Sequence, residues 1–179
     1  MDDKLKEAYA LAQQMDDQAR YGGPKEKEKI TNFLNTLAMI ESSGGKNFNH
    51  PTIESGIHEG HQAVGTYGLM PNTVNEVVNR MQSEGKGFPN LTKLVGREPQ
   101  QIKAAIEQNP QDEQRLAEYL AKHVLAKQQG DEEKAAYSWF QGHNMTPERI
   151  EQQGYKDHDY VKKYNEFKNL MSTLSKPKE

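Results

Sequence analysis

The stretch "ITNFLNTLAMIESSGG", residues 30–45, combines a helical apolar stripe with an abrupt helix stop. Apolar residues recur at the spacing of one helix face, at Ile30, Phe33, Leu34, Leu37 and Ile40. Glu41 comes four positions after Leu37 and therefore extends the same face. Ser-Ser-Gly-Gly then ends the helix. The segment predicts an amphipathic helix that carries a carboxylate at the end of its apolar face.

Glu41 is the residue of this stretch with the clearest chemical meaning. A carboxyl group on an apolar face loses water, which disfavours its charged form and raises its pKa. A raised carboxyl pKa suits a general acid that works near neutral pH. The plainer interpretation is that Glu41 merely ends its helix and turns to solvent. Its position alone does not separate the two.

The rest of the chain also predicts helices separated by glycine- and proline-rich stops. The helices are expected over residues 3–19, 24–41, 72–82, 99–108, 111–129, 132–140, from 147 onward and 157–174. Residues 44–66 lack a period and form a long loop with at most a small β-hairpin. The sequence therefore predicts an all-α fold in a single domain, 1–179, with an extra N-terminal helix over 1–22 and a core over about 24–175.

Composition narrows the function classes. Leu, Ile, Val and Phe make up 31 of the 179 residues, so the core is thin, but their helical spacing indicates a folded chain. Absent cysteines leave no disulfide or thiolate chemistry, and no apolar run is long enough to span a membrane. Interleaved charges with a net charge of -3 argue against nucleic acid as a partner. The first residues do not form a signal peptide, and we expect that one has been removed.

Two later segments favour the catalytic interpretation of Glu41. "GTYGLMPNT", residues 65–73, and "AAYSWFQGHN", residues 135–144, follow Glu41-Ser42 in this order. The order and spacing resemble the soluble lytic transglycosylase and goose-type lysozyme-like superfamily, whose motifs run Glu-Ser, Gly-Leu-Met-Gln, and Ala-Tyr-Asn-Ala-Gly. Tyr160-Val161 resembles its closing motif. The resemblance covers roughly residues 28–165 and implies a lysozyme-like fold.

The resemblance also implies a site and a reaction. Glu41 matches the single catalytic acid/base, which cuts the MurNAc-β-1,4-GlcNAc bond of peptidoglycan and leaves 1,6-anhydro-MurNAc ends without a cofactor. The expected substrate-binding residues are Ser42, Ser43, Tyr67, Gly68, Leu69, Met70, Trp139, Phe140, Gln141 and Tyr160, together with His58 and His61 of the long loop. The implied partner is the glycan strand, bound by a monomer. The implied setting is the periplasm or cell envelope, a secreted protein, or a phage virion.

Departures from the family pattern keep two alternatives open. Met70 runs straight into Pro71 without the family's Gln, Phe140 replaces an Asn, and the segment from Glu41 to Gly68 is longer than usual. One alternative is a lysozyme-like domain that binds peptidoglycan or a partner protein without cutting it. The other is a hydrolysing lysozyme, for which Glu54 or Glu59 would supply a second carboxylate.

The histidines of the long loop, the pair Trp139 and Phe140, and His123 each have a structural interpretation as well as a functional one. "HPTIESGIHEGH", residues 50–61, invites a metal site, but His58 and His61 lie three apart with a glycine between them, unlike the His-Glu-x-x-His pair. We therefore expect a loop that contacts sugar and holds no metal. Trp139 and Phe140 suit the core as well as sugar stacking. The buried face of the helix over 111–129 is expected to consist of Leu116, Tyr119, Leu120, His123 and Val124. His123 is therefore expected to be a satisfied core histidine.

Overall fold

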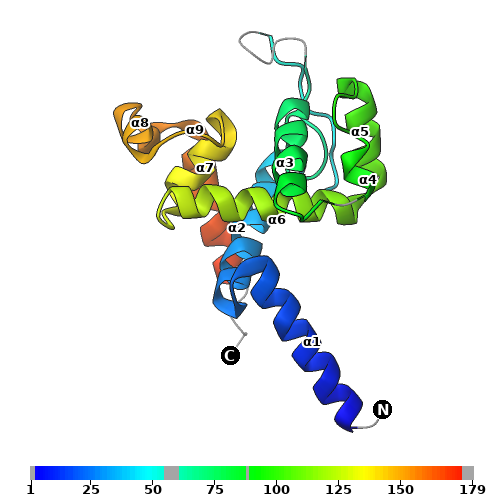
Figure 1. The fold of residues 1–179 in the computed structure, drawn as a ribbon. Coiled ribbons are helices and arrows are strands. Elements are labelled where there is room, and N and C mark those ends of the chain that lie inside the picture. Colours follow the sequence, from blue (N-terminus) through cyan, green and yellow to red (C-terminus); the bar gives the residue numbers. More distant parts are fainter. Residues whose placement is uncertain (1–2, 55–60, 88, 175–179) are drawn as a thin grey trace.

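The computed structural model describes residues 3–54, 61–87 and 89–174, and the described chain is mainly helical (Figure 1). Its helices are α1 Asp3–Tyr21, α2 Pro24–Ser42, α3 Pro71–Ser83, α4 Pro89–Thr92, α5 Pro99–Gln108, α6 Pro110–Lys127, α7 Glu132–Gln141, α8 Pro147–Gln152, the 3₁₀ turn η1 Tyr155–Asp157, and α9 Asp159–Leu174. The described residues contain no strand, only two isolated antiparallel bridges, Thr52 to Gln62 and Val64 to Leu69. The all-α prediction is confirmed.

Helix α2 begins and ends where the sequence predicts. Pro24 occupies the first turn, where its missing N–H is not needed. At the other end Ser43 adopts a left-handed conformation with φ of 53°, and its N–H donates to the carbonyl of Ala38. The side chains of Ile30, Phe33, Leu34 and Leu37 are buried as expected. This apolar face anchors α2, so the position of Glu41 at its end is fixed by packing.

Helix α6 lies in the middle of the molecule. In Figure 1 it runs across the view, with α3, α4 and α5 near one end and α7 and α8 near the other. It packs against α2, α3, α5 and α7, while α2 also packs against α9. The buried residues Leu116, Leu120 and Val124 form its core face. Two groups of helices thus share α6 as their common support.

Some local details differ from the sequence prediction. The four-residue helix α4 was not expected, because one turn is too short to show a period. Tyr119 and His123 were expected on the buried face of α6, and both are only partly buried. Their polar atoms contact the end of α3, where the Tyr119 hydroxyl donates to Glu84 and His123 lies 3.1 Å from Arg80. Polar side chains at that end of α3 hold these two residues at the edge of the core.

Helix α1 extends away from the other helices (Figure 1). Its side chains from Lys6 to Asp16 are exposed, including the large apolar residues Tyr9, Leu11 and Met15. Its last turns are held by the buried Tyr21 and by ion pairs from Arg20 to Glu118 of α6 and from Asp17 to Lys27 of α2. Across the described residues, α1 included, no helix is both long and apolar enough to cross a membrane.

Candidate active site

Glu41 lies at a pocket of about 250 Å³ between the two groups of helices. Helix α2 contributes Glu41, the long loop contributes His50 and Ile53, and α6 contributes Leu120. The predicted site residues that line it are Glu41, Gly68, Leu69, Met70, Trp139, Phe140 and Gln141. Tertiary packing therefore brings the three sequence segments with family-like motifs to one pocket, although they are separated by 23 residues or more.

The carboxyl group of Glu41 remains partly protonated near neutral pH. Burial raises its pKa to about 7, against lowering effects from a Tyr160 hydrogen bond and from the positive charge of Lys163. The Tyr160 hydroxyl donates to Glu41 Oε1 over 2.5 Å. The carboxyl group is thus oriented through one oxygen, and at pH 7 it is present in both protonation states.

The turn Gly65–Gly68 lies directly against Glu41. Gly68 has φ of +63°, and a Cβ atom built on it would overlap Glu41 Oε2 and the carboxyl carbon. Both the backbone conformation and the close approach require glycine here. The absence of a side chain at residue 68 therefore lets the chain cover one side of the Glu41 carboxyl and exclude water from it.

Two residues expected to bind substrate, Ser42 and Trp139, hold this turn. Ser42 is only 2% exposed, and its hydroxyl donates to the carbonyl of Thr66 over 2.7 Å. Trp139 donates from Nε1 to the carbonyl of Tyr67 over 3.1 Å, and its ring packs edge-on against Phe33. The Ser42 hydroxyl is buried and bonded to the turn, so a sugar does not reach it. Trp139 packs against the core and holds the turn, and it also lines the pocket.

Glu113 of α6 is a buried neighbour of this turn that the sequence did not reveal. It is 3% exposed, and its Oε1 accepts the N–H groups of Thr66 over 2.5 Å and Tyr67 over 3.2 Å. Burial raises its pKa, with the two backbone bonds opposing that effect. In the sequence Glu113 stands in "QDEQR", a polar helix start, and nothing there distinguishes it from a solvated residue.

Phe140 presents an aromatic surface at the pocket. Its side chain is 51% exposed, and its ring stacks on Tyr160 with centroids 4.7 Å apart and planes 22° apart. Tyr160 in turn bonds Glu41. An exposed ring beside an acid is suited to contact the apolar face of a sugar, so Phe140 fits the stacking interpretation better than the core one.

The remaining predicted residues lie elsewhere. Ser43 is exposed at the end of α2 and does not line the pocket, and Tyr67 is buried with its hydroxyl bonded to Gln114. His61 lines a different pocket of about 500 Å³, beside α5, and so is not brought to Glu41. His58 and Glu59 lie outside the described residues. Within the described ranges no group of three histidine, aspartate or glutamate side chains could hold a metal ion.

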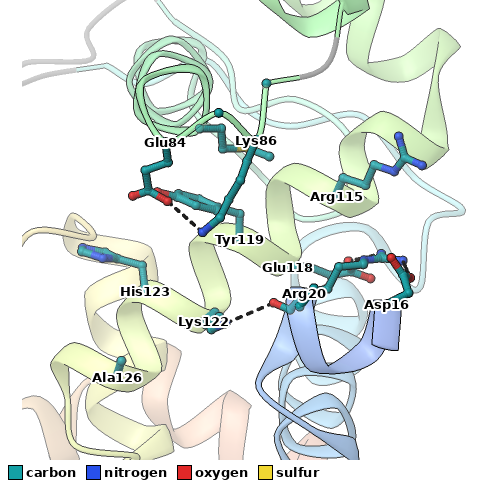
Figure 2. Close-up of a pocket in the computed structure, with 14 residues that line it drawn as sticks. Asp16, Arg20, Glu84, Lys86, Arg115, Glu118, Tyr119, Lys122, His123 and Ala126 are labelled. Atoms are coloured by element: carbon teal, nitrogen blue, oxygen red, sulfur yellow. Dashed lines mark hydrogen bonds and ion pairs between the residues drawn. The ribbon is translucent and has the colours of Figure 1, made fainter. Parts of the chain in front are cut away.

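A larger pocket, of about 620 Å³, lies between the end of α1, the end of α3 and α6 (Figure 2). Two ion pairs lie in its lining: Arg20 pairs with Glu118 over 2.5 Å, and Lys86 pairs with Glu84 over 2.9 Å. The Tyr119 hydroxyl also donates to Glu84. Both glutamates of this lining are thus paired with a cation, so the Glu41 pocket, with its partly buried acid, is the better candidate for catalysis.

Comparisons with family models, with curated proteins and with solved structures found no match to this chain. Its function must therefore be inferred from the Glu41 pocket and the sequence motifs around it.

Proposed function

We propose that the protein is a lytic transglycosylase that cleaves peptidoglycan glycan strands. The observation that carries the proposal is the Glu41 carboxyl, partly buried with its pKa raised to about 7 at the wall of an open pocket. The family-like motifs supply the substrate class, since the pocket geometry by itself indicates only an acid/base site. The glycan strand is the proposed partner, in the cell envelope, outside the cell or on a phage virion.

In the proposed reaction the neutral Glu41 donates its proton to the glycosidic oxygen between MurNAc and GlcNAc. The C–O bond to the anomeric carbon breaks, and the substrate's N-acetyl group meets the positive charge that develops there. The Glu41 carboxylate then takes the proton of the muramoyl 6-hydroxyl, whose oxygen attacks the anomeric carbon and closes the 1,6-anhydro ring. Tyr160 steadies Glu41 Oε1 during both proton transfers.

The number of carboxylates at the pocket supports the transglycosylase over the hydrolase. Hydrolysing glycosidases ordinarily place two carboxyl groups across the bond that they cleave. Among the described residues that line the pocket, Glu41 is the sole acidic side chain. Glu54, one of the two loop glutamates considered for this role, is exposed and does not line the pocket. A pocket with one described carboxyl group fits the transglycosylase reaction, in which the same group first gives and then takes a proton.

The test is the release of fragments from purified peptidoglycan sacculi, analysed by mass spectrometry. The wild-type protein should release muropeptides with 1,6-anhydro ends, lighter than hydrolysed ends by one water. Glu41→Gln should lower the rate by about 10²–10⁴-fold. Glu28→Gln, an exposed glutamate of the same helix, is the matched control and should keep the wild-type rate. Reducing ends throughout would establish the hydrolase instead.

The exposed Phe140 ring favours one second candidate, a peptidoglycan-binding domain without catalysis. An aromatic surface at a pocket is sufficient to hold a glycan, and the Asn that Phe140 replaces would have contacted substrate in the family pattern. This candidate predicts that wild-type protein and Glu41→Gln cosediment equally with sacculi and that neither releases soluble fragments. Release by the wild type alone would exclude it.

A further inference from the structure

The turn Gly65–Gly68 is enclosed by two carboxylates from different helices. A Cβ atom on Gly68 would overlap the carboxyl of Glu41 from α2, and one on Gly65 would overlap the carboxyl of Glu113 from α6. Both glycines have positive φ, +72° at Gly65 and +63° at Gly68. The turn is therefore in close contact with a carboxyl group at each end, and only glycine fits at either place.

Partners outside the turn also satisfy its polar backbone groups. His50 Nε2 lies 2.8 Å from the carbonyl oxygen of Gly65, Ser42 donates to that of Thr66, and Trp139 donates to that of Tyr67. The N–H groups of Thr66 and Tyr67 both donate to one oxygen, Glu113 Oε1. Removing Glu113 would leave two neighbouring N–H groups without their acceptor, and they would draw water into the turn.

We infer that Glu113 is a positioning residue of the active site, which fixes the Gly65–Gly68 turn so that Gly68 stays closed over the Glu41 carboxyl. The catalytic consequence rests on the proposed function, whereas the positioning itself does not. Glu113 lines no part of the Glu41 pocket and acts through the backbone of the turn. Because Gly68 is part of the cover that keeps water from Glu41, a loosened turn hydrates that acid.

Hydration of Glu41 has a measurable consequence. Burial is the largest effect on its pKa and raises it to about 7, so admitting water lowers that pKa toward 4.5. Tyr160 and Lys163, both on α9, act on the pKa of Glu41, and neither acts on the pKa of Glu113. The titratable side chains of His50 and His143 also line the Glu41 pocket. Glu113 itself faces Glu107 across the α5–α6 packing, which raises its pKa slightly further. A change at Glu113 thus reaches Glu41 through the turn.

The test compares three substitutions of Glu113 in the full chain. Glu113→Gln keeps an acceptor oxygen in place of Oε1 and should behave as wild type, because both N–H groups bond to a single oxygen. Glu113→Ala removes the acceptor, and Glu113→Asp keeps the charge but withdraws the acceptor by one methylene group. Glu28→Ala is the control, since it removes an exposed carboxylate of α2, the helix that carries Glu41.

Two readouts separate positioning from general loss of stability. The first is the titration of the Glu41 carboxyl by ¹³C NMR, with the signal assigned by its loss in Glu41→Gln. The second is kcat for fragment release against pH. Glu113→Ala should lower the Glu41 pKa by about one unit and kcat at pH 8 by about tenfold, because activity follows the protonated fraction. Glu113→Asp should shift both in the same direction, and Glu28→Ala should shift neither.

The outcomes distinguish the inference from the proposed function. If wild-type protein releases no fragments, the proposed function fails, and the NMR titration still tests Glu113. If Glu113→Ala does not fold, Glu113→Asp supplies the comparison. A Glu41 titration unchanged in the folded Ala or Asp variant would overturn the inference. So would a Glu113→Gln variant that shifts as far as Glu113→Ala, because rescue by a neutral acceptor is what positioning through Oε1 requires.

Discussion

Replacing Glu41 by Gln should make the protein more stable in alkaline solution, while it removes the proposed acid. The pKa of Glu41 is about 7 in the folded protein, against an ordinary value of 4.5. Between these values the folded state binds one more proton than the unfolded state, so the free energy of unfolding falls as pH rises. Each pH unit removes about 1.4 kcal/mol, and the whole interval removes about 3 kcal/mol. Gln carries no proton that titrates, so the variant escapes this loss.

The expected pattern is a difference that grows with pH. Below pH 4.5 the two proteins should have similar free energies of unfolding, because Glu41 is protonated in both states. At pH 8 the Gln variant should be more stable by about 3 kcal/mol. The Tyr160 hydroxyl keeps an acceptor in either protein, so its hydrogen bond does not distinguish them.

Urea unfolding at pH 4, 5, 6, 7 and 8 measures this difference, since the midpoint and slope give the free energy in water. Trp139, the single tryptophan of the chain, provides the fluorescence signal from a partly buried position near the site. Glu28→Gln on the same helix should change stability by less than about 0.5 kcal/mol at every pH. A Glu41→Gln variant with a constant difference, or one less stable than wild type at pH 8, would refute the reasoning from burial.

Three further predictions concern the turn, the aromatic surface and the long loop. Gly68→Ala should lose about 1–2 kcal/mol of stability from its positive φ, and should also lose fragment release because its Cβ displaces Glu41. Gly85→Ala, with φ of +70° and open space around it, should lose stability alone, as thermal unfolding and activity assays would show. Phe140→Ala should weaken binding to sacculi several-fold, by about 1 kcal/mol, with little change in melting temperature because the ring is half exposed. EDTA should leave melting temperature and fragment release unchanged.

Each of these has an outcome that would contradict it. Equal activity in Gly68→Ala and Gly85→Ala would show that close approach to Glu41 is dispensable. Binding unchanged in Phe140→Ala would remove the ring from the proposed glycan surface. Stoichiometric zinc in the purified protein, lost together with activity on chelation, would assign the loop histidines to a metal.

The helices that the sequence predicted correctly are those whose ends and buried faces are set by interactions between residues close together in the chain. Pro24 and the Ser-Ser-Gly-Gly segment fix both ends of α2, and the spacing from Ile30 to Leu37 fixes its buried face. Such signals depend on residues within one or two turns, so they can be read from the chain directly. Tyr119 packs against the core but stays partly exposed, because its hydroxyl bonds Glu84, 35 residues away.

The sequence by itself determined the all-α class, the position of Glu41 on an apolar face, and the order of the motifs that resemble lytic transglycosylases. Only the tertiary structure decided how the turn at 65–68 is held. Ser42, Trp139 and Glu113 bond to backbone atoms between 24 and 72 residues away, and no local period predicts such partners. A buried N–H or carbonyl group must find a partner wherever the fold places one. Glu113 therefore looks like a surface residue in the sequence and becomes a buried acceptor only when α6 packs against the turn.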